Sequence, residues 1–230
     1  ELLKCDAKLI YISPSHQYPL GTIMPINKRM ELLEWAYKNN GFIIEDDYDA
    51  MIRYGGMPIP CLQGLDKNDC VVYLGSFSKM FLPSLRISFM VIPKKLLTKY
   101  NLIKARHTQS TSKIDQLVLA NFMKEGYMAR HLRRVKRIYK NKNSMLIDKL
   151  KSVYNNKLQI INSNSGLHIV CQAITSKSHN KLSEDAKKSR ILLNIISSKD
   201  NKVIFSLNYS GISMDKIEDF TVLLGKVLFA

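Results

Sequence analysis

The chain has 230 residues, 46% of them hydrophobic, and its 35 basic and 19 acidic residues give a formal net charge of +16. This length and apolar content exclude a disordered chain and allow one large domain or two smaller domains, each with a core of its own. No apolar run approaches the roughly 18 residues of a membrane-spanning helix. Residues 1–5 do not read as a secretion signal.

Cysteine usage and charge bear on location and partners. The cysteines are scattered, with no Cys-x-x-Cys pair, which favours a reducing, cytoplasmic setting. They are Cys5, Cys61, Cys70 and Cys171. A large positive charge favours polyanionic partners through counterion release. Because the lysines are spread along the chain, the charge supports proximity to DNA only weakly.

The first ninety residues predict strands that alternate with helix and loop. Strands are expected at residues 8–12, 42–46, 70–74 and 87–92. Residues 13–25 contain several prolines and a glycine, which indicate a loop. A helix is expected from Asn27, as its N-cap, to about Asn39, and residues 48–69 are expected to be mostly loop. This pattern predicts part of an α/β sheet.

Two of the predicted strands lead directly into polar residues. The apolar run 41–44 leads into the acidic run 45–49, Glu-Asp-Asp-Tyr-Asp, and the run 70–74 leads into Gly-Ser-Phe-Ser-Lys at 75–79. In open α/β sheets, ligands bind beyond the carboxyl ends of the strands. The sequence therefore predicts a binding site where these two strands end.

The residue types at these strand ends suggest one cofactor. Lys79 is expected to be partly withdrawn from water, which favours a nucleophilic amine. Hydroxyl groups and a guanidinium fork suit a phosphate, and the chain supplies them as Ser76, Ser78 and Arg86. Asp46 is an acceptor for a protonated ring nitrogen, and Tyr48 points to the same face of the strand. Together these groups match pyridoxal 5'-phosphate, which takes a lysine Schiff base and an acidic partner.

Each of these residues also has an ordinary explanation. A lysine after a strand is usually solvated, and acidic clusters often cap helices or sit in loops. The two serines can make local turn hydrogen bonds, and Arg86 can form a surface ion pair of little value. Only the joint order and spacing of the residues favour the cofactor site.

That order resembles the fold-type I aminotransferases. Ser-x-Ser-Lys stands at 76–79, an arginine follows seven residues later, and Asp-x-Tyr stands 33 residues before the lysine. More narrowly, Ser-Pro-Ser-His-Gln-Tyr-Pro-Leu-Gly at 13–21, the acidic run at 45–49 and Arg-Tyr at 53–54 look like the MocR subfamily of GntR transcriptional regulators. Those proteins join a winged-helix DNA-binding domain to an aminotransferase-like effector domain. The resemblance is strong to about Pro93 and looser afterwards.

The resemblance implies a fold class and a set of site residues. The fold would be α/β, the C-terminal part of a fold-type I aminotransferase. Residues 1–105 would be the C-terminal part of the large domain, and residues 106–230 would form the small α+β domain. Lys79 would form the Schiff base with pyridoxal 5'-phosphate. The other expected cofactor-binding residues are Asp46, Tyr48, Tyr18, Ser76, Ser78 and Arg86.

Tyr18 marks a departure from ordinary aminotransferases. Those enzymes carry an asparagine before Pro-x-Gly, where it bonds the phenolic oxygen of the cofactor, and here the position is Tyr18. A small-domain arginine often holds the substrate carboxylate in the family, but residues 203–209 contain no arginine. Both features argue against ordinary transamination. Arg53 and Tyr54 would approach a dimer partner's site, or serve as a surface arginine and a packing tyrosine.

The rest of the chain predicts the linking helices and the small domain. Helices are expected at 94–106, 114–124, 127–154, 183–195 and 213–228, the last one capped by Ser213. Strands are expected at 158–161, 167–171 and 203–207. A glycine-rich phosphate turn and a winged helix are not found in the 230 residues. By itself this chain is therefore expected to bind the cofactor weakly.

Two functions remain open at this stage. The first is a sensor domain of a MocR-like regulator, which binds the cofactor or an amine, forms a homodimer and reaches DNA only through a winged-helix domain outside this sequence. The alternative is a fragment of a class I/II aminotransferase that transaminates amino acids. A truncated product without activity is a third possibility.

Overall fold

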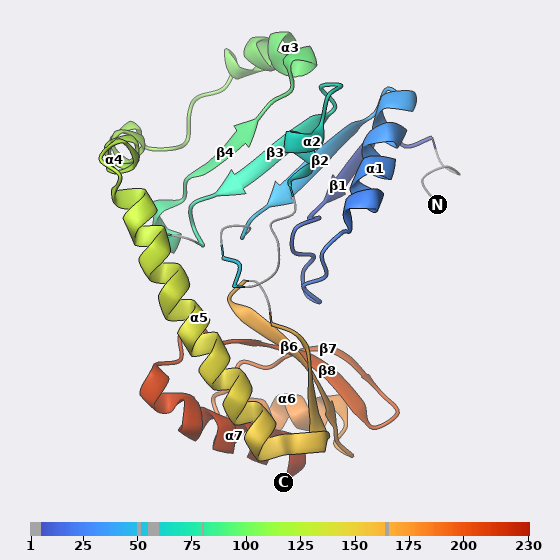
Figure 1. Cartoon of the computed structure of the whole chain (residues 1–230), viewed down its shortest axis with the longest axis vertical. Coiled ribbons are helices and arrows are strands. Elements are labelled where there is room, and N and C mark those ends of the chain that lie inside the picture. Colours follow the sequence, from blue (N-terminus) through green and yellow to red (C-terminus); the bar gives the residue numbers. More distant parts are fainter. Residues whose placement is uncertain (1–5, 50–51, 55–59, 80, 164–165) are drawn as a thin grey trace. The chain divides into compact units, whose positions relative to one another are not determined.

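Figure 1 shows the computed structural model of the chain, which describes residues 6–49, 52–54, 60–79, 81–163 and 166–230. The chain divides into two compact units. The first unit contains residues 1–18, 22–51 and 56–133, and the second contains residues 19–21, 52–55 and 134–230. None of the helices in the described part of the chain has the length and apolar character needed to cross a membrane.

The first unit is built on a four-stranded sheet of order β1-β2-β3-β4. Its strands are β1 (Leu9–Ile12), β2 (Phe42–Asp47), β3 (Val71–Ser76) and β4 (Ser88–Val91). The first three strands are parallel, and β4 runs antiparallel to β3. The helices are α1 (Ile26–Lys38), α2 (Leu62–Leu65), α3 (Lys94–Lys104), α4 (Lys113–Lys124) and the start of α5 (Tyr127–Tyr154). The predicted α/β sheet is confirmed.

The two faces of this sheet differ in how they are covered. Leu33 and Trp35 of α1 pack with Ile43 and Val71 in one buried cluster, so α1 covers one face. On the opposite face, register with Ile44 of β2 places the side chain of Tyr11, which is 61% exposed. The sheet therefore has one apolar, helix-covered face and one accessible face.

Local boundaries in the first unit differ from the sequence prediction in two places. Helix α1 begins at Ile26 after an extended Pro25, and Asn27 is not its N-cap. The residue before a helix needs extended backbone, and Pro25 adopts it. The predicted loop 48–69 contains the short helix α2, because the Glu45 carboxylate accepts from the first helical amides, those of Leu62 and Gln63, at 2.8 and 2.9 Å. A cap so distant in sequence is invisible to local patterns.

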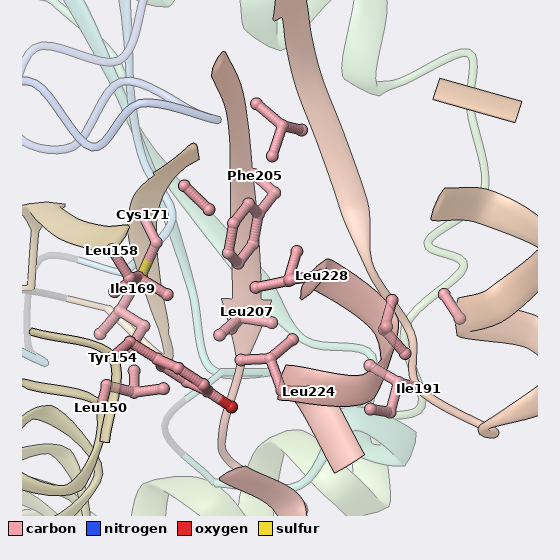
Figure 2. Packing of buried hydrophobic residues seen from close by; sticks show 14 of the residues in the cluster. Leu150, Tyr154, Leu158, Ile169, Cys171, Ile191, Phe205, Leu207, Leu224 and Leu228 are labelled. Atoms are coloured by element: carbon pink, nitrogen blue, oxygen red, sulfur yellow. The ribbon is translucent and has the colours of Figure 1, made fainter. Parts of the chain in front are cut away.

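The second unit is an antiparallel sheet of order β5-β6-β8-β7 with helices packed on it. Its elements are β5 (Leu158–Asn162), β6 (His168–Ile174), α6 (His179–Lys188), β7 (Asn194–Lys199), β8 (Lys202–Asn208), α7 (Ile217–Phe229) and the rest of α5. Figure 2 shows the core, where Leu150 of α5, Phe205 and Leu207 of β8 and Leu224 of α7 belong to one buried cluster. This confirms a small α+β unit at the C-terminal end.

The predicted helix 183–195 has the wrong bounds at both ends. Helix α6 begins earlier, after Ser178, whose hydroxyl accepts from the Lys181 amide at 3.3 Å, and it ends at Lys188. Residues 194–199 form β7 instead, joined to β8 through Asp200 and Asn201, both with positive φ. Two consecutive left-handed residues make the tight hairpin turn that matches strand twist. The final helix also begins later than predicted: Ser213 precedes a 3-10 turn, and α7 starts at Ile217.

Candidate cofactor site

The ends of β2 and β3 bring two predicted site residues onto one face. The parallel register pairs Asp46 with Leu74, and Ser76 lies two residues farther along β3. Because side chains alternate along strands, Asp46 and Ser76 share a face, and strand geometry places them roughly 8 Å apart. This is the accessible face, opposite α1. The separation between Asp46 and Ser76 suits a ligand with a ring nitrogen at one end and a phosphate at the other.

The loop between β3 and β4 holds the remaining phosphate-type donors. Ser76 pairs with Ser88, and the Phe77 amide donates to the Ile87 carbonyl at 3.1 Å, so both ends of the loop are fixed. The Ser78 amide donates to the Ser76 hydroxyl oxygen at 3.2 Å. The structure therefore draws Ser76 and Ser78 together.

Arg86 has an unusual backbone for a residue with a long side chain. Its φ is +50°, in the left-handed region, and it directly follows the 3-10 turn Pro83–Leu85. A non-glycine residue there costs on the order of 1 kcal/mol or more, and such strain gathers at functional sites. Arg86 is exposed and stands at the same end of the sheet as Ser76, two residues before the Ser76 partner Ser88.

Asp46 has a partner that the sequence did not suggest. The hydroxyl of Tyr11, on the adjacent strand β1, donates to Asp46 Oδ2. This hydrogen bond is the first cause, and burial the second, of a raised pKa for the Tyr11 phenol. A donor on one oxygen orients the carboxylate and leaves its other lone pairs for a ligand. Only the parallel register, which places Tyr11 opposite Ile44, brings the two residues to the same face.

Tyr48 is held by a histidine from the loop 13–22. Its hydroxyl donates to the His16 carbonyl oxygen at 3.0 Å, and the two rings stack with centroids 6.1 Å apart. His16 Nδ1 lies 2.6 Å from Asp49 Oδ2, and both side chains are at least 95% buried. Burial, followed by the Asp49 and Asp46 carboxylates, raises the pKa of the Tyr48 phenol. The phenol therefore stays protonated, and a hydrogen-bond donor, at neutral pH.

The other two acids of the cluster face away from the site. Alternation places Glu45 and Asp47 on the α1 side of the sheet, where Glu45 is fully buried and lies 3.7 Å from the Arg29 guanidinium. Tyr73 donates to Asp47 Oδ2 at 2.8 Å. Burial is the first cause of a raised pKa for both carboxyl groups. These acids are structural partners of α1 and α2.

Lys79 and Tyr18 are both exposed. Lys79 lies in the turn after β3, so the described residues do not withdraw it from water as its neighbours in sequence predict. Tyr18, in the loop closed by the Gln17–Thr22 bridge, is 56% exposed. Its phenol is a minor cause of the raised pKa of Tyr48. The structure thus leaves Tyr18 accessible, and it places Lys79 directly after the paired serines.

Tyr54 is a packing residue of the second unit. Its hydroxyl donates to the Gly166 carbonyl oxygen at 2.8 Å and accepts from Tyr209 at 2.7 Å. This favours the simpler of the two roles that the sequence allowed for Tyr54.

The donor set fits pyridoxal 5'-phosphate. Ser76, Ser78 and Arg86 lie at or after the end of β3, Asp46 lies at the end of β2, and Lys79 lies in the loop after β3. A lysine and an acidic partner for the ring nitrogen are the groups that this cofactor takes. Among the described residues, no group of three or more histidine, cysteine, aspartate or glutamate side chains could hold a metal ion.

Comparison with known proteins places this arrangement in a family. The model of the family described as aminotransferase class I and II matches residues 5–198. The HTH-type transcriptional regulator YdeL of Bacillus subtilis is 40% identical over 92% of the chain and 46% of its own length. The probable rhizopine catabolism regulatory protein MocR of Rhizobium meliloti is 36% identical over 72% of the chain and 34% of its own length. The chain spans about half the length of YdeL, and about half the length of YhdI, another B. subtilis relative of this chain.

Solved structures agree on the fold. Kynurenine aminotransferase of Pyrococcus horikoshii superposes with a TM-score of 0.82 at 25% identity, over 96% of this chain and 56% of that one. The α-aminoadipate aminotransferase LysN of Thermus thermophilus, crystallised with a phosphopyridoxyl-leucine conjugate, gives a TM-score of 0.79 at 25% identity, over 95% and 58% of the two chains. The chain therefore has a partial aminotransferase fold.

Proposed function

Because the chain belongs to the aminotransferase class I and II family, we propose that it is the pyridoxal-phosphate-binding part of the effector domain of a MocR-type transcriptional regulator. Lys79 forms the Schiff base. The observation that carries the proposal is the shared face of Asp46 and Ser76 at adjacent parallel strand ends. The relatives named as transcriptional regulators support the regulatory role over a metabolic one.

The chain's own residues divide the binding work. Ser76, Ser78 and Arg86 hold the phosphate through charge-assisted hydrogen bonds. The Asp46 carboxylate, oriented by Tyr11, accepts from the protonated ring nitrogen. When bound, the cofactor supplies an electron sink for amines.

The phenolic side of the site is built from two tyrosines. Tyr48 is a protonated donor at neutral pH, and Tyr18 stands where ordinary aminotransferases carry asparagine. Both phenols donate hydrogen bonds to the phenolic oxygen of the ligand. Because a phenol and an amide differ in shape and in donors, this replacement favours sensing over turnover.

The parent protein is proposed to be a homodimer that responds to a small molecule, either the cofactor itself or an amino compound. DNA binding belongs to a winged-helix domain outside these 230 residues, as the HTH-type names of the relatives suggest. Light scattering of the complete regulator tests the dimer, and a purely monomeric species at micromolar concentration would contradict it.

Genuine transamination is the second candidate, favoured by the fold shared with solved aminotransferases. Tyr18 and the absence of arginine from residues 203–209 argue against it. Incubation with amino acids and a keto acid acceptor separates the two: steady turnover supports the enzyme, and binding without turnover supports the sensor.

The proposal is tested by absorbance titration of the chain with pyridoxal 5'-phosphate. A saturable Schiff-base band of low affinity is expected, because part of the phosphate site lies outside these 230 residues, and the band should be weaker still with pyridoxal, which lacks the phosphate. Lys79→Ala should abolish the saturable band. Lys99→Ala, an exposed lysine of α3 in the same unit, is the matched control and should behave as the wild type. A saturable band that survives in Lys79→Ala would refute the assignment.

A further inference from the structure

Residues 13–18 and 22–25 of the loop 13–25 are fixed within the first unit by backbone and buried side-chain contacts. Arg29, fully buried in α1, donates to the carbonyl oxygens of Pro14 at 2.8 Å and Met24 at 3.1 Å. The Met24 amide donates to the Pro14 carbonyl at 2.8 Å. These bonds close the base of the loop, because they join residues near its two ends.

The middle of the loop is held by a different contact, the buried pair of His16 and Asp49. Their side chains are 3% and 5% exposed, and Nδ1 and Oδ2 are 2.6 Å apart. Removing two such groups from water is costly, and a buried pair of this kind is weak evidence for stability alone. Its position between the loop and the residues after β2 points to a positional role.

The same histidine sets the direction of the Tyr48 hydroxyl. An ionised carboxylate only accepts hydrogen bonds, so the contact with Asp49 assigns the proton to Nδ1 of His16. The Tyr48 hydroxyl, 3.4 Å from that nitrogen, then has no acceptor there and donates to the His16 carbonyl oxygen at 3.0 Å. The stacked rings, 25° apart in plane, fix the orientation of the phenol.

We propose that His16 is a positioning residue: its buried pair with Asp49 holds the loop that carries Tyr18 against the end of β2 and presents the Tyr48 phenol to the cofactor's phenolic oxygen. This inference rests on the proposed function. A phenol has one hydroxyl proton, so the Tyr48 hydroxyl donates either to the His16 carbonyl oxygen or to a ligand. Occupation of the site thus exchanges a bond within the protein for one to the ligand, and the loop then depends on the His16–Asp49 pair.

The test compares four substitutions in the complete regulator. His16→Phe keeps a ring for stacking but removes Nδ1, and His16→Asn places an amide donor near the position of Nδ1 and should rescue the contact. His107→Phe, at an exposed position of the same unit, is the matched control. Asp49→Asn, which keeps the shape of the pair and removes its charge, serves as a second probe in case His16→Phe fails to fold.

Two readouts are expected to move together. In the protein without cofactor, the ring resonances of Tyr48, assigned by Tyr48→Phe, should titrate at lower pH in His16→Phe, because the loop residue stacked on the phenol is no longer held by Asp49 and the phenol becomes more exposed. The dissociation constant for pyridoxal 5'-phosphate should rise on the order of tenfold in His16→Phe, the loss that accompanies one hydrogen bond. His16→Asn should lie within about threefold of the wild type, and His107→Phe should equal it.

The outcomes separate the inference from the proposed function. If the wild type shows no saturable binding at all, the proposed function fails and the inference falls with it. If the wild type binds but His16→Phe and Asp49→Asn bind equally well, with Tyr48 titrating as before, the inference alone is wrong. A loss in His16→Phe that His16→Asn does not rescue would assign the histidine to folding and would also overturn it.

Discussion

The two units differ in the buried charged groups that they contain. The first unit buries Arg29, Glu45, His16 and Asp49, each at most 5% exposed, and uses them to join loops to the ends of its strands. The second unit buries a continuous apolar cluster that includes Phe205 and Leu224, both 0% exposed, and most of its buried polar residues are uncharged (Figure 2). The difference shows that the second unit is organised for packing and the first for holding side chains in place beside a site.

The sheets differ in the same sense. In the second unit the central strands β6 and β8 are largely buried, whereas every residue of β4 in the first unit is exposed. Apolar burial therefore stabilises the second unit mainly on one face of its sheet, where Ile169, Phe205 and Leu207 belong to the buried cluster. The first unit depends on one covered face and on buried polar contacts, which are more sensitive to the loss of a single partner.

The largest effect is expected for Arg29→Met in the first unit. It leaves Glu45 buried without its cation and removes three donors to loop carbonyls, so the free energy of unfolding should fall by roughly 3–5 kcal/mol. Urea unfolding followed by fluorescence of Trp35, the only tryptophan, reports this unit. Lys28→Met, at a neighbouring position 59% exposed, is the control and should change it by less than about 0.5 kcal/mol. If Arg29→Met and Lys28→Met lowered the free energy of unfolding equally, buried polar contacts would not be what stabilises the first unit.

The second unit should respond most to a lost apolar side chain. Leu207→Ala, at a position 1% exposed, creates a cavity and should cost about 3 kcal/mol, measured by hydrogen exchange of the β8 amides. Leu192→Ala makes the same chemical change at a position 86% exposed and should be nearly neutral. If Leu207→Ala were also neutral, the packed core would not be the source of stability in this unit.

Helix caps should behave alike in both units, because they are local. Ser112 in the first unit and Ser178 in the second each accept from a backbone amide at 3.3 Å. Replacement by alanine should cost about 1 kcal/mol in either case, measured by urea unfolding. A clear difference between the units would show that their local elements, and not only their cores, are stabilised differently.

The smallest effect concerns pH and Asp47. Burial raises the pKa of its carboxyl group above the ordinary value of 3.8, so the folded state favours the protonated acid. The stability it contributes is present below pH 3.8 and is lost as the pH rises through the raised pKa. Asp47→Asn should therefore gain stability relative to the wild type between pH 4 and 7. Glu31→Gln, at an exposed position, should show no such trend in parallel urea titrations, and a trend of opposite sign for Asp47→Asn would contradict the burial argument.

The sequence predicts the long elements better than the turns between them. The helix over residues 127–154 agrees with α5 at both ends, because its apolar stripe repeats at helical spacing over many turns. Strand β7 was missed, because Ile191, Leu192 and Ile195 fit a helical spacing. The sequence signal for β7 is the Asp200-Asn201 pair, which favours a hairpin turn and therefore a strand, not a helix, directly before it.

The site divides in the same way. Apolar runs followed by polar residues predict where β2 and β3 end, and the structure brings those ends together. The partners Tyr11, His16 and Arg29 could not be assigned from the sequence, because each acts on a residue 15 or more positions away. Strand register and loop closure decide such contacts, and a local pattern contains neither.

The loop that follows β3 in the first unit carries Lys79, the lysine proposed to bond the cofactor. Borohydride reduction of the chain with pyridoxal 5'-phosphate, followed by peptide mapping, measures which lysine is labelled. Lys79 should carry most of the label, excess inorganic phosphate should suppress the labelling, and Arg86→Ala should weaken it. A label spread evenly over the exposed lysines, or concentrated on a lysine other than Lys79, would contradict this proposal.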